Sequence, residues 1–261
     1  MNKSYPKISV ILCVYNGEKY IIDCLESISQ QTYDDYEVII INDGSSDKTL
    51  HLIESYYANK SESVTVVNQS NQGLTKSLNI AISISKGEYI ARVDADDICH
   101  KFRFEKSIQF IESKKLDFIT TRAERFTSTK SQGVVPNYIK LKSGIIEFLF
   151  LRYGNPFVHG TFFGKKRIFT LLKYDESYRT AQDFDFLCRL LKNKMFKVGY
   201  LNEVTYYLRI LENSLGRAKG STQRDNALAI ARKHFGTDKY MIIKYGTIPR
   251  LILSFHKRLF S

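Results

Sequence analysis

Cysteine is scarce in this 261-residue sequence, and its few cysteines are scattered. The four of them, Cys13, Cys24, Cys99 and Cys188, stand far apart and form no sequence cluster with histidine. Structural zinc sites and disulfide frameworks need ligands or partners at characteristic spacings, so neither is indicated. Reduced thiols fit a cytoplasmic protein, and this is the location that we expect.

Long hydrophobic runs are also absent. No apolar run approaches the roughly 18 residues that a membrane-spanning helix requires. The first residues, MNKSYPK, lead directly into a strand pattern and lack the features of a secretory signal. We therefore expect a chain that is neither exported by that route nor inserted across a membrane.

Two glycine-rich nucleotide-binding motifs are missing. No G-x-G-x-x-G follows the first predicted strand, and no Walker-type G-K-[ST] occurs anywhere in the sequence. Their absence argues against a dinucleotide-dependent enzyme and against a phosphate-loop ATPase. A nucleotide held by carboxylates and a metal ion remains open.

Acidic residues are outnumbered by basic ones. The sequence has 39 Lys and Arg against 27 Asp and Glu, a net charge of +12. Residues 207–261 hold eleven of these basic residues and three acidic ones, so the positive charge is concentrated in the C-terminal part. The length suits one large α/β domain, or one domain with a C-terminal appendage.

Apolar runs alternate with helical patterns through the first hundred residues. Runs rich in β-branched residues at 8–14, 37–41 and 63–67, and the run from Tyr89, are typical of buried strands. Apolar residues recur at helical spacing over 20–31, 49–57 and 73–85. Four strand–helix alternations predict a Rossmann-like, mostly parallel sheet flanked by helices.

The stretch Tyr89–Asp97, YIARVDADD, changes abruptly from apolar to acidic. Asp94 and Asp96 flank Ala95, so an extended backbone would direct both carboxylates to one face, where they repel unless a cation lies between them. Mg²⁺ or Mn²⁺, with a diphosphate as co-ligand, would satisfy them. The alternative is a solvated acidic turn in which Asp97 caps a helix that begins near Phe102.

Polar residues end two further predicted strands. Tyr15-Asn16 follows the first strand and Asn42-Asp43 follows the second. Because the carboxyl ends of parallel strands meet at one edge of a sheet, we expect these residues to lie near Asp94–Asp97.

Several segments within about the first 110 residues resemble family 2 glycosyltransferases. In order, they are SVILCVYN at 9–16, CLESI at 24–28, QTY at 31–33, EVIIINDGSSD at 37–47, GEYI at 87–90 and DADD at 94–97. Spaced motifs in a fixed order are much more specific than any single motif. The resemblance implies a GT-A fold, a nucleoside-diphosphate sugar donor, a divalent metal and inversion at the anomeric carbon.

The resemblance assigns the nucleobase to the ends of the first two strands. Cys13, Val14 and Tyr15 would line this part of the donor site, with Tyr15 offering a stacking face. Asp43 would accept an N–H of the base. Alternatively, Tyr15 is a core aromatic residue and Asp43 caps a turn.

The resemblance assigns the remainder of the donor to the acidic strand end. Asp94 would bind near the ribose or the metal, Asp96 would ligate Mn²⁺ or Mg²⁺, and Ala95 would lie between them. Lys76 stands where a basic residue approaches the diphosphate, or it is a solvated helix charge. Asp97 is expected to be structural.

A second acidic motif, RTAQDFDFLCRL, occupies residues 179–190. It resembles the acidic pair of the family followed by an amphipathic helix, in which the second acid is the catalytic base. Asp183 occupies the base position and is preferred over Asp185, whereas Gln182 departs from the expected first acid. The alternative is that Asp183 is an N-cap without chemistry.

The reaction itself explains why one metal and one base suffice. Breaking a sugar–phosphate bond builds negative charge on the leaving diphosphate, which a metal at Asp96 stabilises as a Lewis acid. Asp183 would take the proton of the acceptor hydroxyl during attack from the opposite face. A retaining covalent route needs another nucleophilic carboxylate, and no persuasive second candidate is present.

The second half of the chain carries fewer signals. Residues 104–111 suggest a helix, 117–122 a strand, and 130–142 a polar loop in which acceptor choice would be made. The segment NPFVHGTF at 155–162 resembles a family segment that leads into a strand. His159 within it either contacts donor phosphate or acceptor, or is structural.

We expect a GT-A domain over residues 1–206, divided into a nucleotide-binding half (1–115) and an acceptor-side half (116–206). Residues 207–261 would form the basic helical extension. It contains an apolar stripe beside basic residues, which suits a short helix lying on an anionic membrane surface or packing on the enzyme. The stripe comprises Ile248, Leu251, Ile252, Phe255 and Leu259, and the basic residues are Arg250, Lys257 and Arg258.

The expected function is transfer of a sugar, from a UDP-sugar in the first instance, to a saccharide acceptor. A lipid-linked acceptor at the inner face of a bacterial membrane, in capsule, exopolysaccharide or O-antigen assembly, is inferred from the resemblance. Two other classes remain: a catalytically inactive scaffold that binds sugar nucleotides, and a basic nucleic-acid-binding protein. The second lacks a recognition motif, and an acidic strand end would repel phosphates, so no nucleic-acid partner is expected. A nucleotidyltransferase is a closer rival, but its glycine- and arginine-rich first loop is absent.

Overall fold

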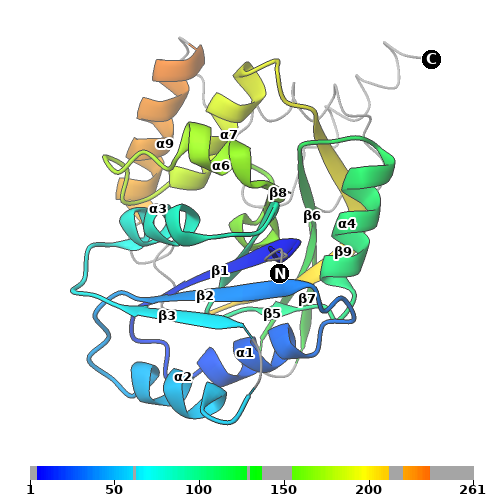
Figure 1. Ribbon diagram of the computed structural model, residues 1–261. Coiled ribbons are helices and arrows are strands. Elements are labelled where there is room, and N and C mark those ends of the chain that lie inside the picture. Colours follow the sequence, from blue (N-terminus) through cyan, green and yellow to red (C-terminus); the bar gives the residue numbers. More distant parts are fainter. Residues whose placement is uncertain (1–4, 61–62, 128–129, 137–154, 212–219, 236–261) are drawn as a thin grey trace.

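The computed structural model describes residues 5–60, 63–127, 130–136, 155–211 and 220–235 (Figure 1). Its strands are β1 (Ile8–Val14), β2 (Tyr36–Asn42), β3 (Val64–Asn68), β4 (Tyr89–Asp94), β5 (Ile98–Cys99), β6 (Phe118–Phe126), β7 (Ser131–Val135), β8 (Phe163–Lys165) and β9 (Val198–Arg209). Its helices are α1 (Ile21–Ser29), α2 (Thr49–Tyr57), α3 (Leu74–Ile84), α4 (Arg103–Ser113), the 3₁₀ helix η1 (His159–Thr161), α6 (Lys166–Leu172), α7 (Gln182–Lys192) and α9 (Gly220–Phe235).

All of these strands belong to one sheet, with the order β3-β2-β1-β4-β8-β6-β9-β5 and with β7 paired to β6. The first four strands in this order are parallel, as the strand–helix alternation predicts. Helices α1 and α2 lie on one side of this parallel part, and α3, α6 and α7 lie on the other (Figure 1). Burial on both faces explains why these strands are apolar runs without polar alternation.

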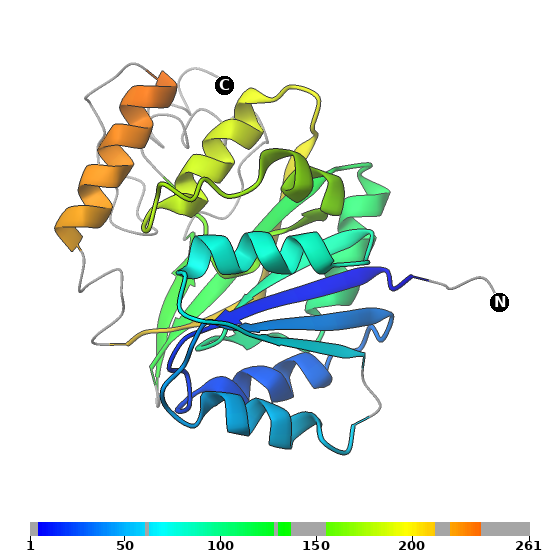
Figure 2. The ribbon, with the colours of Figure 1, turned by 60° about the vertical axis from the view of Figure 1, so that its left-hand side comes forward.

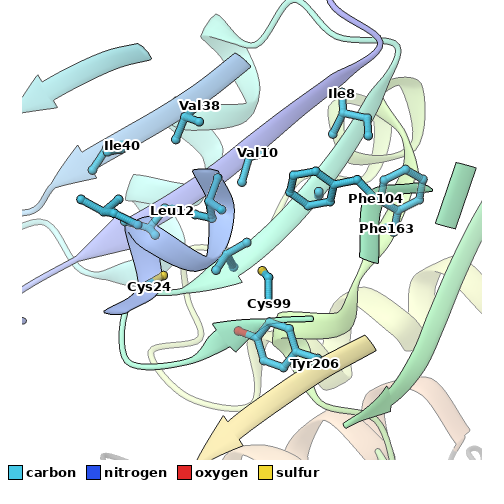
Figure 3. Close-up of a cluster of buried hydrophobic side chains, with 14 of the residues drawn as sticks. Ile8, Val10, Leu12, Cys24, Val38, Ile40, Cys99, Phe104, Phe163 and Tyr206 are labelled. Atoms are coloured by element: carbon cyan, nitrogen blue, oxygen red, sulfur yellow. The ribbon is translucent and has the colours of Figure 1, made fainter. Parts of the chain in front are cut away.

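Alternate side chains of the parallel strands enter two separate cores. Val10 and Leu12 of β1 belong to the cluster completed by α1, α2 and α4, whereas Ile11 belongs to the cluster completed by α3, α6 and α7. In the first cluster, β1 and β2 meet Cys24 of α1, and Tyr206 of β9 lies beside Cys99 (Figure 3). The two cores hold the parallel strand ends in a fixed position.

The second half of the sheet is mixed, whereas the first half is parallel as predicted. β8 runs antiparallel to β4 and β6, whereas β9 runs parallel to β6. β8 has only three residues and follows directly on the turn of η1.

Two short strands depart from the sequence predictions. β5 directly follows the acidic stretch and was not predicted, because two residues give no periodic signal. β7 lies inside the polar segment that was predicted as a loop, so that prediction is wrong for residues 131–135. Its polar side chains reflect an exposed edge strand paired only to β6.

The C-terminal part that the structure describes packs on the sheet domain. β9 continues through residue 206 to Arg209, and α9 lies beside α7 (Figure 2). Ala227, Ile230 and Ala231 of α9 are buried in the same cluster as Phe186. The division of the chain at residue 206 remains a prediction.

In the described ranges, no helix is both long and apolar enough to cross a membrane. The predicted apolar stripe of residues 248–259 and residues 137–142 of the predicted loop lie outside these ranges.

Candidate active site

Three strand ends meet at one edge of the parallel sheet, as predicted. Cys13 of β1 is in register with Ile41 of β2 on one side and with Asp94 of β4 on the other. The backbone N–H of Asp43 donates to the Val14 carbonyl at 2.8 Å, which ties the loops after β1 and β2 together. The polar residues that follow these strands therefore share one edge.

The residues at the end of β1 face different directions. Cys13 packs on the α3 side of the sheet, whereas Val14 is buried in the core on the α1 side. Val14 can therefore contribute to a donor site through its backbone only. Tyr15 is 54% exposed, so its ring is accessible for stacking and is not the core aromatic residue of the alternative.

Asp43 anchors the loop that leads into α3. One carboxylate oxygen accepts the Gln69 side-chain amide at 2.7 Å and the Gln72 backbone N–H at 2.9 Å, and the other accepts the Gly73 N–H at 2.8 Å. A carboxylate has about four acceptor positions, so roughly one remains for a ligand. The structure thus shows a loop-organising role for Asp43, and its contact with a nucleobase stays a prediction.

Gly44 keeps this loop close to its neighbour. It has a φ of +76°, and a Cβ atom on it would come within 2.7 Å of the Asn71 backbone nitrogen. Only glycine suits this position, which explains the glycine in the segment after β2.

Arg92 is a residue of the site that sequence analysis overlooked. It precedes Asp94 by two positions on β4, so the alternation of the strand places both on the α3 side. Both terminal nitrogens of Arg92 donate to the carboxylate oxygens of Asp94. The Arg92 side chain is only 2% exposed. The counter-cation that the acidic stretch requires is therefore supplied in part by the chain itself.

The chain turns immediately after Asp94. The Asp97 N–H donates to the Asp94 carbonyl at 3.2 Å, so the extended backbone assumed for Asp94 to Asp96 is wrong. The two carboxylates still interact, because burial, followed by the charge of Asp94, raises the pKa of Asp96 to about 6. Asp96 thus carries a charge that its surroundings compensate poorly.

Asp97 is structural, as predicted, but it does not cap α4. Its carboxylate is buried and accepts the backbone N–H of Arg209 at 2.8 Å. The N-cap of α4 is Phe102, which makes no side-chain capping bond. Asp97 instead joins the acidic turn to the end of β9.

Arg209 also binds the acidic turn, and no sequence signal indicated this role. Its Nε donates to the Asp96 carbonyl at 2.9 Å, and a terminal nitrogen pairs with Asp23 of α1 at 2.8 Å. Its guanidinium also lies over the rings of Tyr20 and Phe126. Arg209 of β9, itself paired with Asp23 of α1, therefore helps to fix the position of Asp96.

Asp183 lies in the first turn of α7 and is half-buried. Its Oδ2 accepts the side-chain amide of Asn155 at 2.6 Å. Burial raises the pKa of Asp183, and the hydrogen bond from Asn155, that from Phe184 N–H and the charge of Arg92 oppose this rise. A carboxylate with a raised pKa suits a general base.

Asp185 is occupied by structural partners. It is fully buried, and its oxygens contact Arg189 Nε at 2.7 Å and His234 Nε2 at 2.9 Å. These contacts join α7 to α9. Of the two aspartates in the second motif, only Asp183 is accessible.

The charge of Arg92 acts on groups of the acidic turn, on Tyr174 and on the start of α7. Burial raises the pKa of Tyr174, Arg92 opposes this rise, and Asp183, Cys13 and Asp94 add to it. Arg92 also lowers the pKa of Asp183 and of Asp96. These charge interactions show that residues from β1, β4 and α7 lie around one buried cation.

His159 lies beside the same cation. Its Nε2 is 2.8 Å from the Tyr174 hydroxyl, and its ring meets Phe162 edge to face. Burial, followed by the charge of Arg92, lowers the pKa of His159 well below its ordinary value. His159 is therefore a neutral group at neutral pH.

The two remaining predicted residues are less constrained by the structure. Lys76 is exposed on α3, and Ala95 is in the acidic turn. Within the described ranges, no group of three or more His, Cys, Asp or Glu side chains could hold a metal alone. A metal at Asp96 would need oxygen ligands from a bound donor.

Carboxylates and an accessible aromatic ring lie together at the carboxyl ends of the parallel strands. This edge is the usual ligand-binding place of an open α/β sheet, so the fold and the site define an α/β ligand-binding protein. The sequence profile described as "Glycosyl transferase family 2" matches residues 9–172. The chain therefore belongs to family 2 of the glycosyltransferases, and the resemblance found in the sequence is confirmed.

Relatives and solved structures agree with this assignment. The "Putative glycosyltransferase EpsE" of Bacillus subtilis (strain 168) is 30% identical over 232 residues, which cover 87% of this chain and 81% of the relative. S. aureus TarS 1–349 in complex with UDP-GlcNAc has a TM-score of 0.64 and 25% identity, covering 80% of this chain and 60% of that one.

A more distant structure shows the fold alone. The mannosyltransferase PcManGT from Pyrobaculum calidifontis, in complex with GDP-Man and Mn²⁺, has a TM-score of 0.66 and 16% identity, covering 88% of this chain and 64% of that one. This chain thus spans less than two thirds of both solved chains. The expected GT-A fold is confirmed, with the mixed sheet described above, and the chain is a nucleotide-sugar glycosyltransferase.

Proposed function

We propose that this enzyme transfers a sugar, with inversion, from a nucleoside-diphosphate sugar to a saccharide acceptor. The observation that carries the proposal is the grouping of the acidic turn and Asp183 around Arg92. The acidic turn would bind the donor, and Asp183 would act on the acceptor. The relative solved with UDP-GlcNAc supports a UDP-sugar as the donor.

The donor would lie along the ends of β1, β2 and β4. Tyr15 is exposed and suits stacking on the base, and Asp43 keeps roughly one acceptor position for a base N–H. The backbone of Cys13 and Val14, with Ala95, would line the same site. The exposed side chain of Lys76 is available to the diphosphate.

Mn²⁺ or Mg²⁺ fits Asp96 better than Asp94. Asp94 is already paired with Arg92, whereas in the described residues no cationic side chain is bonded to the Asp96 carboxylate, and burial and the neighbouring charge of Asp94 raise the pKa of Asp96. Asp96 would therefore be the protein ligand, and Asp94 would lie beside it. When bound, the metal supplies Lewis-acid stabilisation of the leaving diphosphate.

Asp183 would act as the general base. The acceptor hydroxyl gives its proton to the carboxylate, the acceptor oxygen bonds to the anomeric carbon, and the diphosphate leaves with the electron pair of the broken bond. The charge of Arg92 favours the ionised carboxylate and opposes the rise in pKa that burial causes. Attack from the face opposite the leaving group inverts the anomeric centre.

The acceptor is proposed to be lipid-linked and to belong to cell-surface polysaccharide assembly, such as capsule, exopolysaccharide or O-antigen. The basic sequence after residue 207 and the apolar stripe at 248–259 support peripheral contact with the inner face of an anionic membrane. Deletion of 248–261 should abolish co-sedimentation with anionic vesicles; unchanged co-sedimentation would remove this part of the proposal.

The test of the base is Asp183→Asn. This change removes proton acceptance but leaves the donor site intact, so transfer should fall by at least about a hundredfold while donor-induced thermal stabilisation persists. Asp185→Asn is the control, because Asp185 is a buried structural residue of the same helix. It should lower stability but retain transfer at low temperature. Parallel loss of transfer and donor binding in Asp183→Asn would contradict the role.

One observation favours a second candidate, a scaffold that binds sugar nucleotides without turnover. Gln182 replaces the first acid of the motif, and its side-chain oxygen is buried without a hydrogen-bond partner in the described residues. Such a scaffold would bind the sugar nucleotide as tightly as an active enzyme would, but would not turn it over. The absence of any turnover by the unmodified protein would decide for this candidate.

A further inference from the structure

The side chain of Asn155 is held in one orientation. Its Oδ1 accepts the backbone N–H of Phe157 at 2.8 Å, two residues further along the chain. Since an amide oxygen cannot donate, the other end of the amide must be the donor group. Nδ2 of Asn155 therefore donates to Oδ2 of Asp183 at 2.6 Å.

The backbone around Asn155 is held as well. Pro156 follows it, which restricts the conformation of Asn155 to extended regions. Phe157 and Val158 are then buried in the two opposite cores of the sheet, at 4% and 5% exposure. The asparagine thus stands at the start of a segment that cannot shift without disturbing both cores.

Asp183 has few other partners from the elements around it. The charged or titratable groups that act on it or feel its charge are Arg92 of β4, Tyr174 after α6, and Cys188 on its own helix. The described residues provide one side-chain hydrogen bond to its carboxylate, and that bond comes from Asn155. Backbone N–H groups of Asp183 and Phe184 also act on this carboxylate, but they belong to the first turn of its own helix, so Asn155 is the side chain from another segment that orients it.

We propose that Asn155 is the positioning residue of the catalytic base: it holds one oxygen of Asp183 and directs the other oxygen toward the acceptor hydroxyl. The inference rests on the proposed function, since it takes Asp183 as the base. In the transfer step the proton moves from the acceptor hydroxyl to this second oxygen, while the first stays bonded to Asn155.

The hydrogen bond from Asn155 should also affect the pKa of Asp183. A hydrogen bond donated to a carboxylate stabilises the charged form, so its loss raises the pKa of Asp183. One such bond corresponds to about one pH unit. The acid limb of the pH–rate profile should then shift to higher pH by the same amount, because the base stays protonated up to a higher pH.

Two variants separate this role from a folding role. Asn155→Asp keeps the oxygen that accepts the Phe157 N–H but replaces the donor with an acceptor beside Asp183. Asn155→Ala removes both groups. The matched control is Asn226→Ala, because the Asn226 amide donates to the Thr180 hydroxyl at 2.8 Å near the same helix start without touching Asp183.

The first readout needs no acceptor. The carboxyl carbon of Asp183 is followed by ¹³C NMR between pH 3 and 9, with its signal assigned by its loss in Asp183→Asn. We expect the pKa of Asp183 to rise by about one unit in Asn155→Ala and by more in Asn155→Asp, where a like charge is added. Asn226→Ala should leave it unchanged. An unchanged pKa in both Asn155 variants would overturn the inference.

The second readout is turnover of UDP-GlcNAc with Mn²⁺, by transfer or by slow hydrolysis, as a function of pH. The acid limb should move upward with the NMR pKa, and kcat should fall while KM for the donor stays the same. If Asp183→Asn retains activity, the proposed function fails regardless of Asn155. If Asp183→Asn is inactive and the pH profiles of the Asn155 variants match the unmodified enzyme, only the inference fails.

Discussion

At the scale of single residues, the site is a set of carboxylates distinguished by their partners. Asp94 has Arg92, Asp97 has the backbone of β9, and Asp185 has Arg189 and His234. Asp96 and Asp183 have raised pKa values, are partly accessible and, in the described part of the chain, have no cationic side chain bonded to the carboxylate; the pKa of Asp97 is raised as well, but this residue is buried. Those two are the carboxylates to which chemistry is assigned.

The Arg92–Asp94 pair makes a quantitative prediction. Arg92→Met leaves Asp94 without its partner, and because the Asp94 side chain is 29% exposed, the free energy of unfolding should fall by about 1–3 kcal/mol. Asp94→Asn should also be costly, because it leaves the buried guanidinium unpaired. The double variant should lose less than the sum of the two, as measured by urea denaturation at pH 7. Strict additivity would show that the pair does not act as a unit.

His159 predicts a pH dependence of stability. Its folded-state pKa lies below its ordinary value, so the unfolded chain takes up the proton first as pH falls below about 6.5. The free energy of unfolding should therefore decline from pH 7 to pH 5. His159→Gln should flatten this decline, whereas His51→Gln, at an exposed position on α2, should not. An equal decline of the unfolding free energy with falling pH in the unmodified protein, His159→Gln and His51→Gln would contradict this prediction.

Much of this residue-level arrangement could not be read from the sequence. Tyr15, Asp43 and Asp94–Asp97 stand directly after apolar runs, so their place at the sheet edge follows from the strand pattern. Arg92 was visible as a charge within a buried strand, two positions before Asp94, but its significance was overlooked. Asn155 and Arg209 reach the site from segments distant in the sequence, and only the folded chain brings them there.

At the scale of elements, the first half of the chain was predictable and the second half was less so. β1 and α2 have the predicted bounds, because long apolar runs and helical spacing give strong periodic signals. β5, β7 and β8 are short, and their pairing is decided by tertiary contacts instead of by pattern. The second half of the sheet therefore departs most from the prediction.

Helix α9 makes the prediction at this scale. Ile230 is fully buried against the α7 side of the core, so Ile230→Ala should cost about 2–4 kcal/mol. The same change at Ile84, which is 37% exposed at the end of α3, should cost much less. Urea denaturation of both variants measures the difference. A neutral Ile230→Ala would show that α9 belongs to an independent extension and not to the catalytic domain.

At the scale of the whole molecule, acidic and basic regions are separated along the chain. The acidic turn and Asp183 occupy the sheet edge, whereas eleven basic residues follow residue 207. An anionic donor could not approach such an acidic edge unless cations compensate it. Arg92 is one such cation, and a metal ion at Asp96 is the second that the account requires.

The most direct measurement is thermal stabilisation by UDP-, GDP-, dTDP- and CMP-sugars, each with and without Mn²⁺. A ligand that binds the folded state increases the free energy of unfolding by mass action, by about 2.7 kcal/mol at a concentration of 100 Kd, and so raises Tm. The account predicts stabilisation by one nucleotide class, UDP-sugars first, that depends on Mn²⁺ and is lost in Asp96→Asn but kept in Asp183→Asn. No stabilisation by any donor at millimolar ligand and metal would contradict it, and so would stabilisation that is indifferent to both Mn²⁺ and Asp96.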